Sequence, residues 1–205
     1  MDTHGLHQLV AAISAAAAAR DHYTASHQKK VSELARRIAQ QLELPSTQIE
    51  CIRISALLHD IGKLGVPSSI LSKTGKLRKE EFDLIKVHPV VGEEILQEVS
   101  FQWPVASIIR QHHERLDGSG YPDGLKGEQI HFEAKVIAVA DVVESISHSR
   151  AYRQALGQEK AIEEISKNRG ILYEPIVVDA CIALYDLNQG DLFAAEHKAT
   201  KSTQL

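Results

Sequence analysis

Two pairs of adjacent residues in this sequence bring together side chains that bind metal ions. His59 is followed by Asp60, and His112 is followed by His113. Imidazole and carboxylate groups without thiolate suit iron, manganese or zinc, and a carboxylate such as Asp60 can bridge two ions. Burying such groups without partners is costly, so the two pairs favour a metal site if their segments face the protein interior.

A helix predicted over residues 24–42 places one more histidine in the interior. Its apolar residues recur at three- and four-residue steps, and His27 lies four residues before Val31 on the same stripe. A single inward histidine, such as His27 or His88, is more often a satisfied core residue than a metal ligand. The case for metal therefore depends on several such residues converging.

A second helix is predicted to open at the capping box Thr47-Gln48-Ile49-Glu50. Its apolar face, extended by one turn beyond Ala56, reaches His59. Gly62 is expected to mark the end of this helix, where side chains can fan around an ion.

Two further helices end close to histidines. The first is predicted over residues 79–87, and Pro89 kinks or restarts it just after His88. The second carries two apolar columns that extend to His112 and His113. The second segment therefore directs its two histidines inward, whereas His88 lies at a helix end.

The second half of the chain begins with a loop rich in glycine and proline, over residues 114–129. A helix over residues 132–147 follows, in which Asp141 lies on the apolar side, a poor place for a carboxylate without a partner. Residues 158–168 and 175–187 have the pattern of packing helices. The expected fold class is all-α.

One buried metal site explains all the inward polar residues together. They come from five separate segments and are His27, His59, Asp60, His88, His112, His113 and Asp141.

Size and composition limit the class of protein. The 205 residues, 43% of them hydrophobic, suffice for one compact domain with ragged ends. A formal net charge of -4 argues against a broad basic surface for long nucleic acids, while bound cations could still attract a small anionic ligand. Cys51 and Cys181 form no disulfide framework, so a reducing cytoplasm fits best.

The alanine-rich stretch at residues 9–19 is too short to span a bilayer and has no basic region before it. We interpret it as a helix, neither an export signal nor a membrane segment. It could pair with another copy of the chain, join a sensor domain outside these residues, or pack within the chain.

Longer motifs in the sequence resemble the HD-GYP family of bacterial cyclic di-GMP phosphodiesterases, a branch of the HD hydrolase superfamily. The resemblance extends from Arg20-Asp21 through His27 to Arg150-Ala151-Tyr152-Arg153. Its most specific parts are His59-Asp60-Ile61-Gly62-Lys63 and His112-His113-Glu114-Arg115-Leu116-Asp117-Gly118-Ser119-Gly120-Tyr121-Pro122. It implies an HD-type helical bundle with a glycine-rich GYP loop over residues 21–193, preceded by an alanine-rich helix or linker at 1–20 and followed by a polar tail at 194–205.

The resemblance also implies a centre of two divalent metal ions, with iron or manganese favoured. One ion would be held by His27, His59, Asp60 and Asp141, and the other by Asp60, His88, His112 and His113. Some family members hold a third ion through a glutamate four residues before the first histidine, where this chain has Tyr23.

Roles in catalysis and substrate binding follow from the same resemblance. Asp60 and Lys63 are the implied catalytic residues, with Lys63 pairing a phosphate oxygen or the leaving group. Asp21, Arg150 and Arg153 would recognise the bases. From the residues alone, Lys63 could instead cap its helix, and the arginine pair could be solvated surface.

Two features leave alternatives open. In the family, the loop around Tyr121 is a proposed contact for GGDEF-domain cyclases, but here it could simply support His112 and His113. Ser149 and Ala151 depart from the Asp-Arg-Pro-Tyr that relatives often carry, and Glu144 and Ser145 depart from the family's small-residue pattern after Asp141. We expect these changes to affect base recognition rather than metal binding, and so substrate preference more than hydrolysis.

We therefore expect hydrolysis of cyclic di-GMP to linear pGpG, with slower onward hydrolysis to GMP. The rival hypotheses are a cyclic dinucleotide sensor without catalysis, and an HD phosphohydrolase acting on another cyclic dinucleotide or nucleotide.

Overall fold

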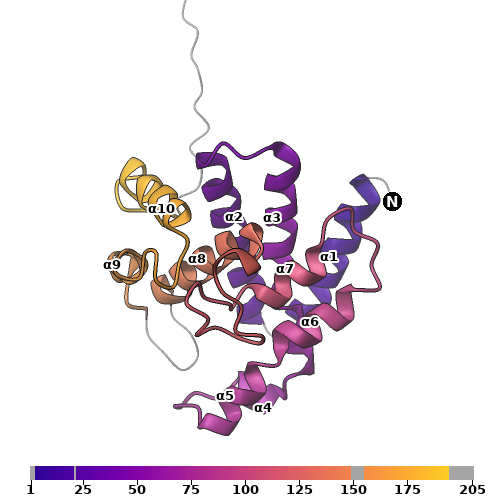
Figure 1. The fold of residues 1–205 in the computed structure, drawn as a ribbon. Coiled ribbons are helices and arrows are strands. Elements are labelled where there is room, and N and C mark those ends of the chain that lie inside the picture. The colour runs from indigo at the N-terminus through magenta and orange to yellow at the C-terminus, as the bar shows by residue number, and fades with distance from the viewer. Residues whose placement is uncertain (1–2, 21, 149–154, 194–205) are drawn as a thin grey trace, which may run out of the picture.

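The computed structural model describes residues 3–20, 22–148 and 155–193, and its regular structure is helical (Figure 1). The helices in chain order are α1 (Thr3–Arg20), α2 (His22–Gln41), α3 (Ser46–Leu58), η1 (Ile61–Gly65), α4 (Ser68–Leu71), α5 (Lys79–Ile85), α6 (His88–Leu96), α7 (Val105–Gln111), η2 (Gly127–Gln129), α8 (Phe132–Ser147), α9 (Gln158–Lys167) and α10 (Pro175–Leu187). Over the described ranges there is no strand, only an isolated bridge between Arg169 and Tyr173. The all-α prediction is confirmed.

The helices pack around two apolar clusters. The larger one joins α2, α3 and α8 to α9 and α10, which lie at the left in Figure 1. The smaller one lies between α1, α3, η1, α6 and α7. Both α3 and α7 contribute to both clusters: Ile52 and Ile108 face the larger one, whereas Leu58 and Ile109 face the smaller. The C-terminal ends of α3 and α7 are thereby fixed from two sides.

Strong apolar periodicity predicted the long helices well. The bounds of α8 and α10 match the expected residues 132–147 and 175–187, and α2 begins two residues before the expected residue 24. Pro89 restarts the chain as the second residue of α6, and Pro104 immediately precedes α7 as its N-cap residue.

The expected capping box at Thr47 is wrong. α3 begins one residue earlier, at Ser46, with Pro45 as its N-cap residue and no side-chain hydrogen bond at the cap. Proline fixes its own backbone angle near the value needed at a helix entrance, so the start does not require a side-chain cap.

The expected role of Gly62 is also wrong. α3 ends at Leu58, and Gly62 lies within η1. An added Cβ at Gly62 would meet the backbone of α6, 1.8 Å from the His88 carbonyl oxygen and 2.5 Å from the Gly92 nitrogen. Glycine is therefore needed here because η1 and α6 cross at close range.

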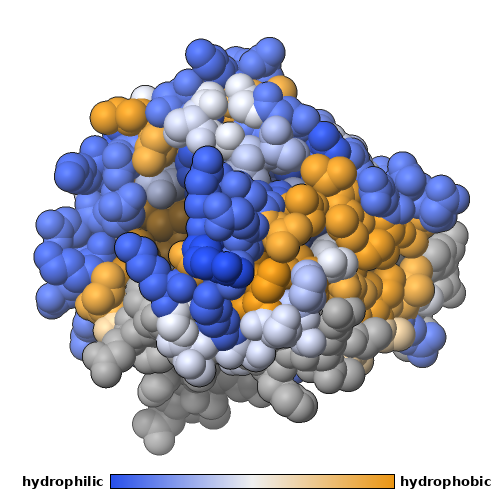
Figure 2. Space-filling view, turned by 90° about the horizontal axis from the view of Figure 1, so that it is seen from below, coloured by the Kyte–Doolittle hydropathy of each residue, from blue (hydrophilic) through white to orange (hydrophobic). Residues whose placement is uncertain are grey.

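The N-terminal helix packs within the chain, as one of the three alternatives anticipated. α1 contacts α2, α3 and η1, and its Val10 is buried in the smaller apolar cluster. Among the described residues, no helix combines the length and apolarity needed to cross a membrane. The face in Figure 2 mixes hydrophilic side chains with apolar areas, the largest of them right of centre.

Candidate metal centre

Helix ends deliver most of the predicted ligands to one place. His59 is the C-cap residue of α3, and Asp60 is the N-cap residue of η1. His88 is the first residue of α6, and His112 is the C-cap residue of α7. The remaining two helices, α2 and α8, present His27 and Asp141 from within.

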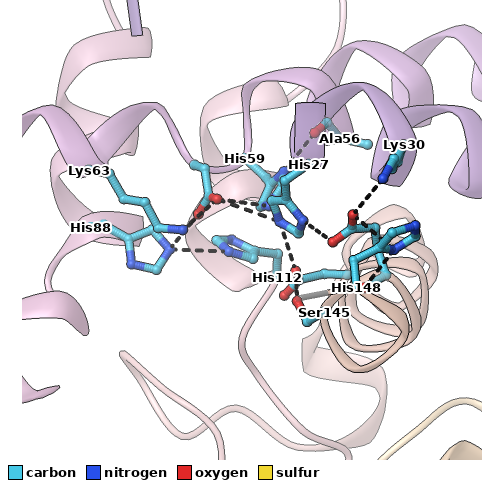
Figure 3. Close-up of polar contacts among 12 residues, drawn as sticks. His27, Lys30, Ala56, His59, Lys63, His88, His112, Ser145 and His148 are labelled. Atoms are coloured by element: carbon cyan, nitrogen blue, oxygen red, sulfur yellow. Dashed lines mark hydrogen bonds and ion pairs between the residues drawn. The ribbon is translucent and has the colours of Figure 1, made fainter. Parts of the chain in front are cut away.

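Asp60 lies close to three of the predicted histidine ligands, His27, His59 and His88, which Figure 3 labels. Its Oδ2 is 3.7 Å from Nε2 of His27 and 3.5 Å from Nε2 of His59. Its Oδ1 faces the other way, 3.4 Å from Nε2 of His88. A carboxylate whose two oxygens face different histidines has the arrangement that bridging two ions requires.

The other ligand atoms form two sets on either side of Asp60. The potential ligand atoms of His27, His59 and Asp141 all lie within 4.8 Å of one another, as do those of His88, His112 and His113. A third set, His59, Asp60 and His112, is equally compact and takes one histidine from each of the first two. Apart from Asp60, the first two sets match those that the family resemblance implies. The structure thus brings the seven residues together, while their assignment to individual ions stays a prediction.

Backbone carbonyls fix the tautomer of three histidines. In each, Nδ1 lies against the carbonyl oxygen three residues earlier. The pairs are His59 with Ala56 at 2.6 Å, His88 with Ile85 at 2.8 Å, and His112 with Ile109. A carbonyl only accepts, so Nδ1 carries the proton and Nε2 keeps its lone pair, as in metal-binding histidines.

This tautomer makes the centre fit a cation. Nε2 of His88 and Nε2 of His112 are 3.3 Å apart, so two lone pairs face each other. Nε2 of His59 is buried and has no hydrogen-bond partner. Buried acceptors turned toward one another are unfavourable unless a positive charge lies between them, so the residues present fit a metal centre.

The protonation states of four of the five predicted histidine ligands suit cation binding. His27 is the exception: burial alone would lower its pKa, but the carboxylates of Asp141 and Glu144 raise it above the usual value. Burial lowers the pKa of His88 to about 4 and lowers the pKa values of His59, His112 and His113, which leaves these rings neutral near pH 7. Burial alone would raise the pKa of Asp60, but the Lys63 ammonium, the largest opposing influence, holds it well below its usual value.

Lys63 lies at the rim of the centre. Its Nζ is 2.6 Å from Oδ2 of Asp60, and 20% of its side chain is exposed. The sequence had suggested that Lys63 either pairs with a phosphate or caps its helix. The ion pair with Asp60 is a third kind of contact, which neither interpretation included. Asp21, Arg150 and Arg153, the predicted base-recognition residues, lie outside the described residues.

The glycine-rich loop at residues 114–129 packs against His112 and His113. The Tyr121 ring stacks on His113, with ring centroids 4.6 Å apart and an interplanar angle of 25°. An added Cβ at Gly120 would lie within 2.5 Å of the backbone of residues 113–115. The buried carboxylate of Glu114 accepts the backbone N–H groups of Asp123 and Leu125. Sequence reasoning missed Glu114, since a loop has no periodicity to indicate that an acid is buried.

The expectation that Glu144 affects base recognition rather than metal binding is not supported by its position, because Glu144 is the partner of His27. Glu144 is buried in α8 one turn after Asp141, and its Oε2 contacts Nδ1 of His27. Its spacing of three residues from Asp141 was the available signal, because the two carboxylates must share a helix face.

Comparison with known proteins identifies the family. A model described as the HD domain matches residues 11–177 of this chain. The chain belongs to the HD domain family. A Bdellovibrio bacteriovorus HD-GYP-type protein, Bd1817, has a similar fold, with a TM-score of 0.65 over 78% of this chain and 51% of its own, at 22% identity.

Two curated relatives share more sequence with this HD domain. One is the cyclic di-GMP phosphodiesterase response regulator RpfG of Xanthomonas campestris, 41% identical over 80% of this chain and 44% of its own length. The other is the 3'3'-cGAMP-specific phosphodiesterase 3 of Vibrio cholerae, 36% identical over 85% of this chain and 38% of its own. The HD domain described here therefore spans less than half the length of these relatives.

Proposed function

We propose that this HD domain is a metal-dependent phosphodiesterase that hydrolyses cyclic di-GMP to linear pGpG. The observation that carries the proposal is the buried set of histidines whose Nε2 atoms converge around Asp60. The names of the curated relatives support a cyclic dinucleotide as substrate.

The metal content is part of the proposal. Two divalent ions, iron or manganese, would share Asp60, one with His27, His59 and Asp141, the other with His88, His112 and His113. When bound, such ions supply Lewis acidity toward phosphoryl oxygens and make hydroxide available near neutral pH.

The protein side chains then bind and orient the substrate. Hydrolysis adds one water across a P–O3′ bond and leaves a 5′-phosphate and a free 3′-hydroxyl. The part-exposed ammonium of Lys63 would donate to a non-bridging phosphate oxygen or to the departing 3′ oxygen. Asp21, Arg150 and Arg153 remain the predicted contacts to the guanine bases.

A second substrate is favoured by a specific observation. The Vibrio cholerae relative is named for cyclic GMP-AMP, and Ser149 and Ala151 replace residues next to the predicted base-recognition arginines. Cyclic GMP-AMP is therefore the second candidate. Slower onward cleavage of pGpG to GMP remains a further prediction.

The loop around Tyr121 has two proposed roles. Its stacking on His113 supports a role in holding that ligand. Contact with a GGDEF-domain protein through the same loop remains a prediction, as does pairing with a second copy of the chain.

Turnover by the metal-loaded protein tests the proposal. Protein loaded with Mn²⁺ or Fe²⁺ is incubated with cyclic di-GMP or cyclic GMP-AMP, and the products are separated by chromatography. We expect pGpG from cyclic di-GMP, loss of turnover in Asp60→Asn, and normal turnover in the control Asp179→Asn, whose carboxylate is exposed and paired with Arg169. Tight binding without any product would instead favour the sensor hypothesis.

A further inference from the structure

Glu144 holds one of the predicted ligands without being a predicted ligand itself. It lies on α8, is 1% exposed, and directs Oε2 at Nδ1 of His27. Asp141, one turn earlier, has Oδ1 3.2 Å from Nε2 of the same ring. Carboxylates from two consecutive turns of α8 therefore contact the two ring nitrogens of His27: Glu144 at Nδ1 and Asp141 at Nε2.

The position of His27 in its helix explains why it needs a carboxylate. The histidines at positions 59, 88 and 112 lie at helix ends, where a backbone carbonyl is available to accept the Nδ1 proton. His27 lies inside α2 (His22–Gln41), where carbonyl oxygens accept the helical hydrogen bonds. An acceptor for its Nδ1 proton must therefore come from another helix, and Glu144 supplies it.

Glu144 is itself fixed from the other side. Its Oε1 is 3.9 Å from Nζ of Lys30 and 3.3 Å from Nδ1 of His148 (Figure 3). Lys30 is one turn beyond His27 on α2, and His148 is one turn beyond Glu144. With Oε1 engaged by these two groups, Oε2 stays directed at His27.

We propose that Glu144 is the positioning residue of His27: it retains the proton on Nδ1, so that Nε2, which lies beside Asp60 and Asp141, is the nitrogen that gives up its proton to bind a cation. The inference rests on the proposed function insofar as that function includes a metal centre. It assigns to Glu144 the task that backbone carbonyls perform for His59, His88 and His112. Carboxylates that accept from metal-binding histidines typically contribute about 10- to 100-fold to metal affinity.

Zinc titration of the metal-free protein tests this role independently of turnover. Zn²⁺ is added in competition with a fluorescent chelator to wild type, Glu144→Gln, Glu144→Ala and Glu144→Asp. We expect Glu144→Gln and Glu144→Ala to lower the Zn²⁺ affinity of one class of site about 10- to 100-fold and to leave the affinity of the other class unchanged. Glu144→Asp keeps the negative charge on a shorter side chain, so this variant should retain part of the Zn²⁺ affinity that Glu144→Gln and Glu144→Ala lose.

A matched control lies on the same helix. Glu133 is also on α8, but its carboxylate accepts from Gln48 rather than from a predicted ligand. Glu133→Gln should bind Zn²⁺ as wild type does. Equal affinity in wild type, Glu144→Gln and Glu144→Ala would overturn the role of Glu144 while leaving the proposed function intact. Absence of Zn²⁺ binding by wild type would overturn the proposed function itself.

A measurement on the unmutated protein covers the case in which the variants fail to fold. Long-range proton–nitrogen correlation spectra of the Zn²⁺-loaded wild type, labelled with ¹⁵N-histidine, report the tautomer of each ring. We expect a protonated Nδ1 and an unprotonated Nε2 for His27. The opposite tautomer would overturn the inference.

Discussion

Replacing Gly62 with alanine should disturb the metal centre although position 62 carries no functional group. The contact at risk is the crossing of η1 and α6, which sets the distance between Asp60 and His88. An alanine Cβ would lie 1.8 Å from the carbonyl oxygen of His88 and 2.5 Å from the nitrogen of Gly92. Both obstacles are backbone atoms, so no side-chain rotation relieves the clash.

The size of the effect follows from these distances. Cβ contacts under 3.0 Å essentially never occur, so Cβ and the His88 oxygen, 1.8 Å apart, must separate by at least ~1.2 Å. Overpacking of this kind costs about 1–3 kcal/mol of stability, or ~2–12 °C in Tm for a chain of this size. A displacement near 1 Å at a catalytic site can lower the rate about 100-fold.

Two measurements check the outcome for Gly62→Ala: its Tm by circular dichroism and its metal content by elemental analysis. Gly75→Ala is the matched control, because an added Cβ there meets nothing within 4 Å. We expect Gly62→Ala to melt lower and to bind less metal than both wild type and Gly75→Ala. Wild-type Tm and metal content in Gly62→Ala would refute the argument that this crossing holds the site.

Three further predictions concern single side chains. His88→Asn should lose metal bound on its side of Asp60, whereas His131→Asn, whose ring nitrogen pairs with Ser107, should bind metal normally in the same titration. Tyr121→Phe keeps the ring that stacks on His113 and should retain turnover. Tyr121→Leu loses a stacking contact of about 0.5–1.5 kcal/mol and should turn over substrate more slowly. Equal turnover rates in Tyr121→Leu and wild type would count against the role of Tyr121 in supporting His113. Ile137→Ala removes a fully buried side chain from the larger apolar cluster and should lower the free energy of unfolding by about 2–5 kcal/mol, measured by urea denaturation.

Periodicity made the long helices and their inward histidines predictable. His27 was placed by the stripe of α2, and Asp141 by the apolar face of α8, because each follows neighbours three or four residues away. Such local spacing states which residues face inward. It does not identify the residues of other helices that these side chains contact in the interior.

The features that sequence reasoning missed depend on contacts between distant segments. Glu144 lies 117 residues from His27, and only the packing of α2 on α8 makes them partners. Gly62 has the composition signal of a helix end, but its actual constraint is the backbone of α6. The roles of Asp21, Arg150 and Arg153 fall outside the described residues and rest on the family resemblance.

Elemental analysis of freshly purified protein tests the central claim most directly. We expect about two iron or manganese ions per chain in the wild type and a clear loss in Asp60→Asn, whose side chain no longer offers two anionic oxygens to the facing histidines. Wild-type protein that holds no metal after purification, and takes up none when Mn²⁺ or Fe²⁺ is supplied, would contradict the account.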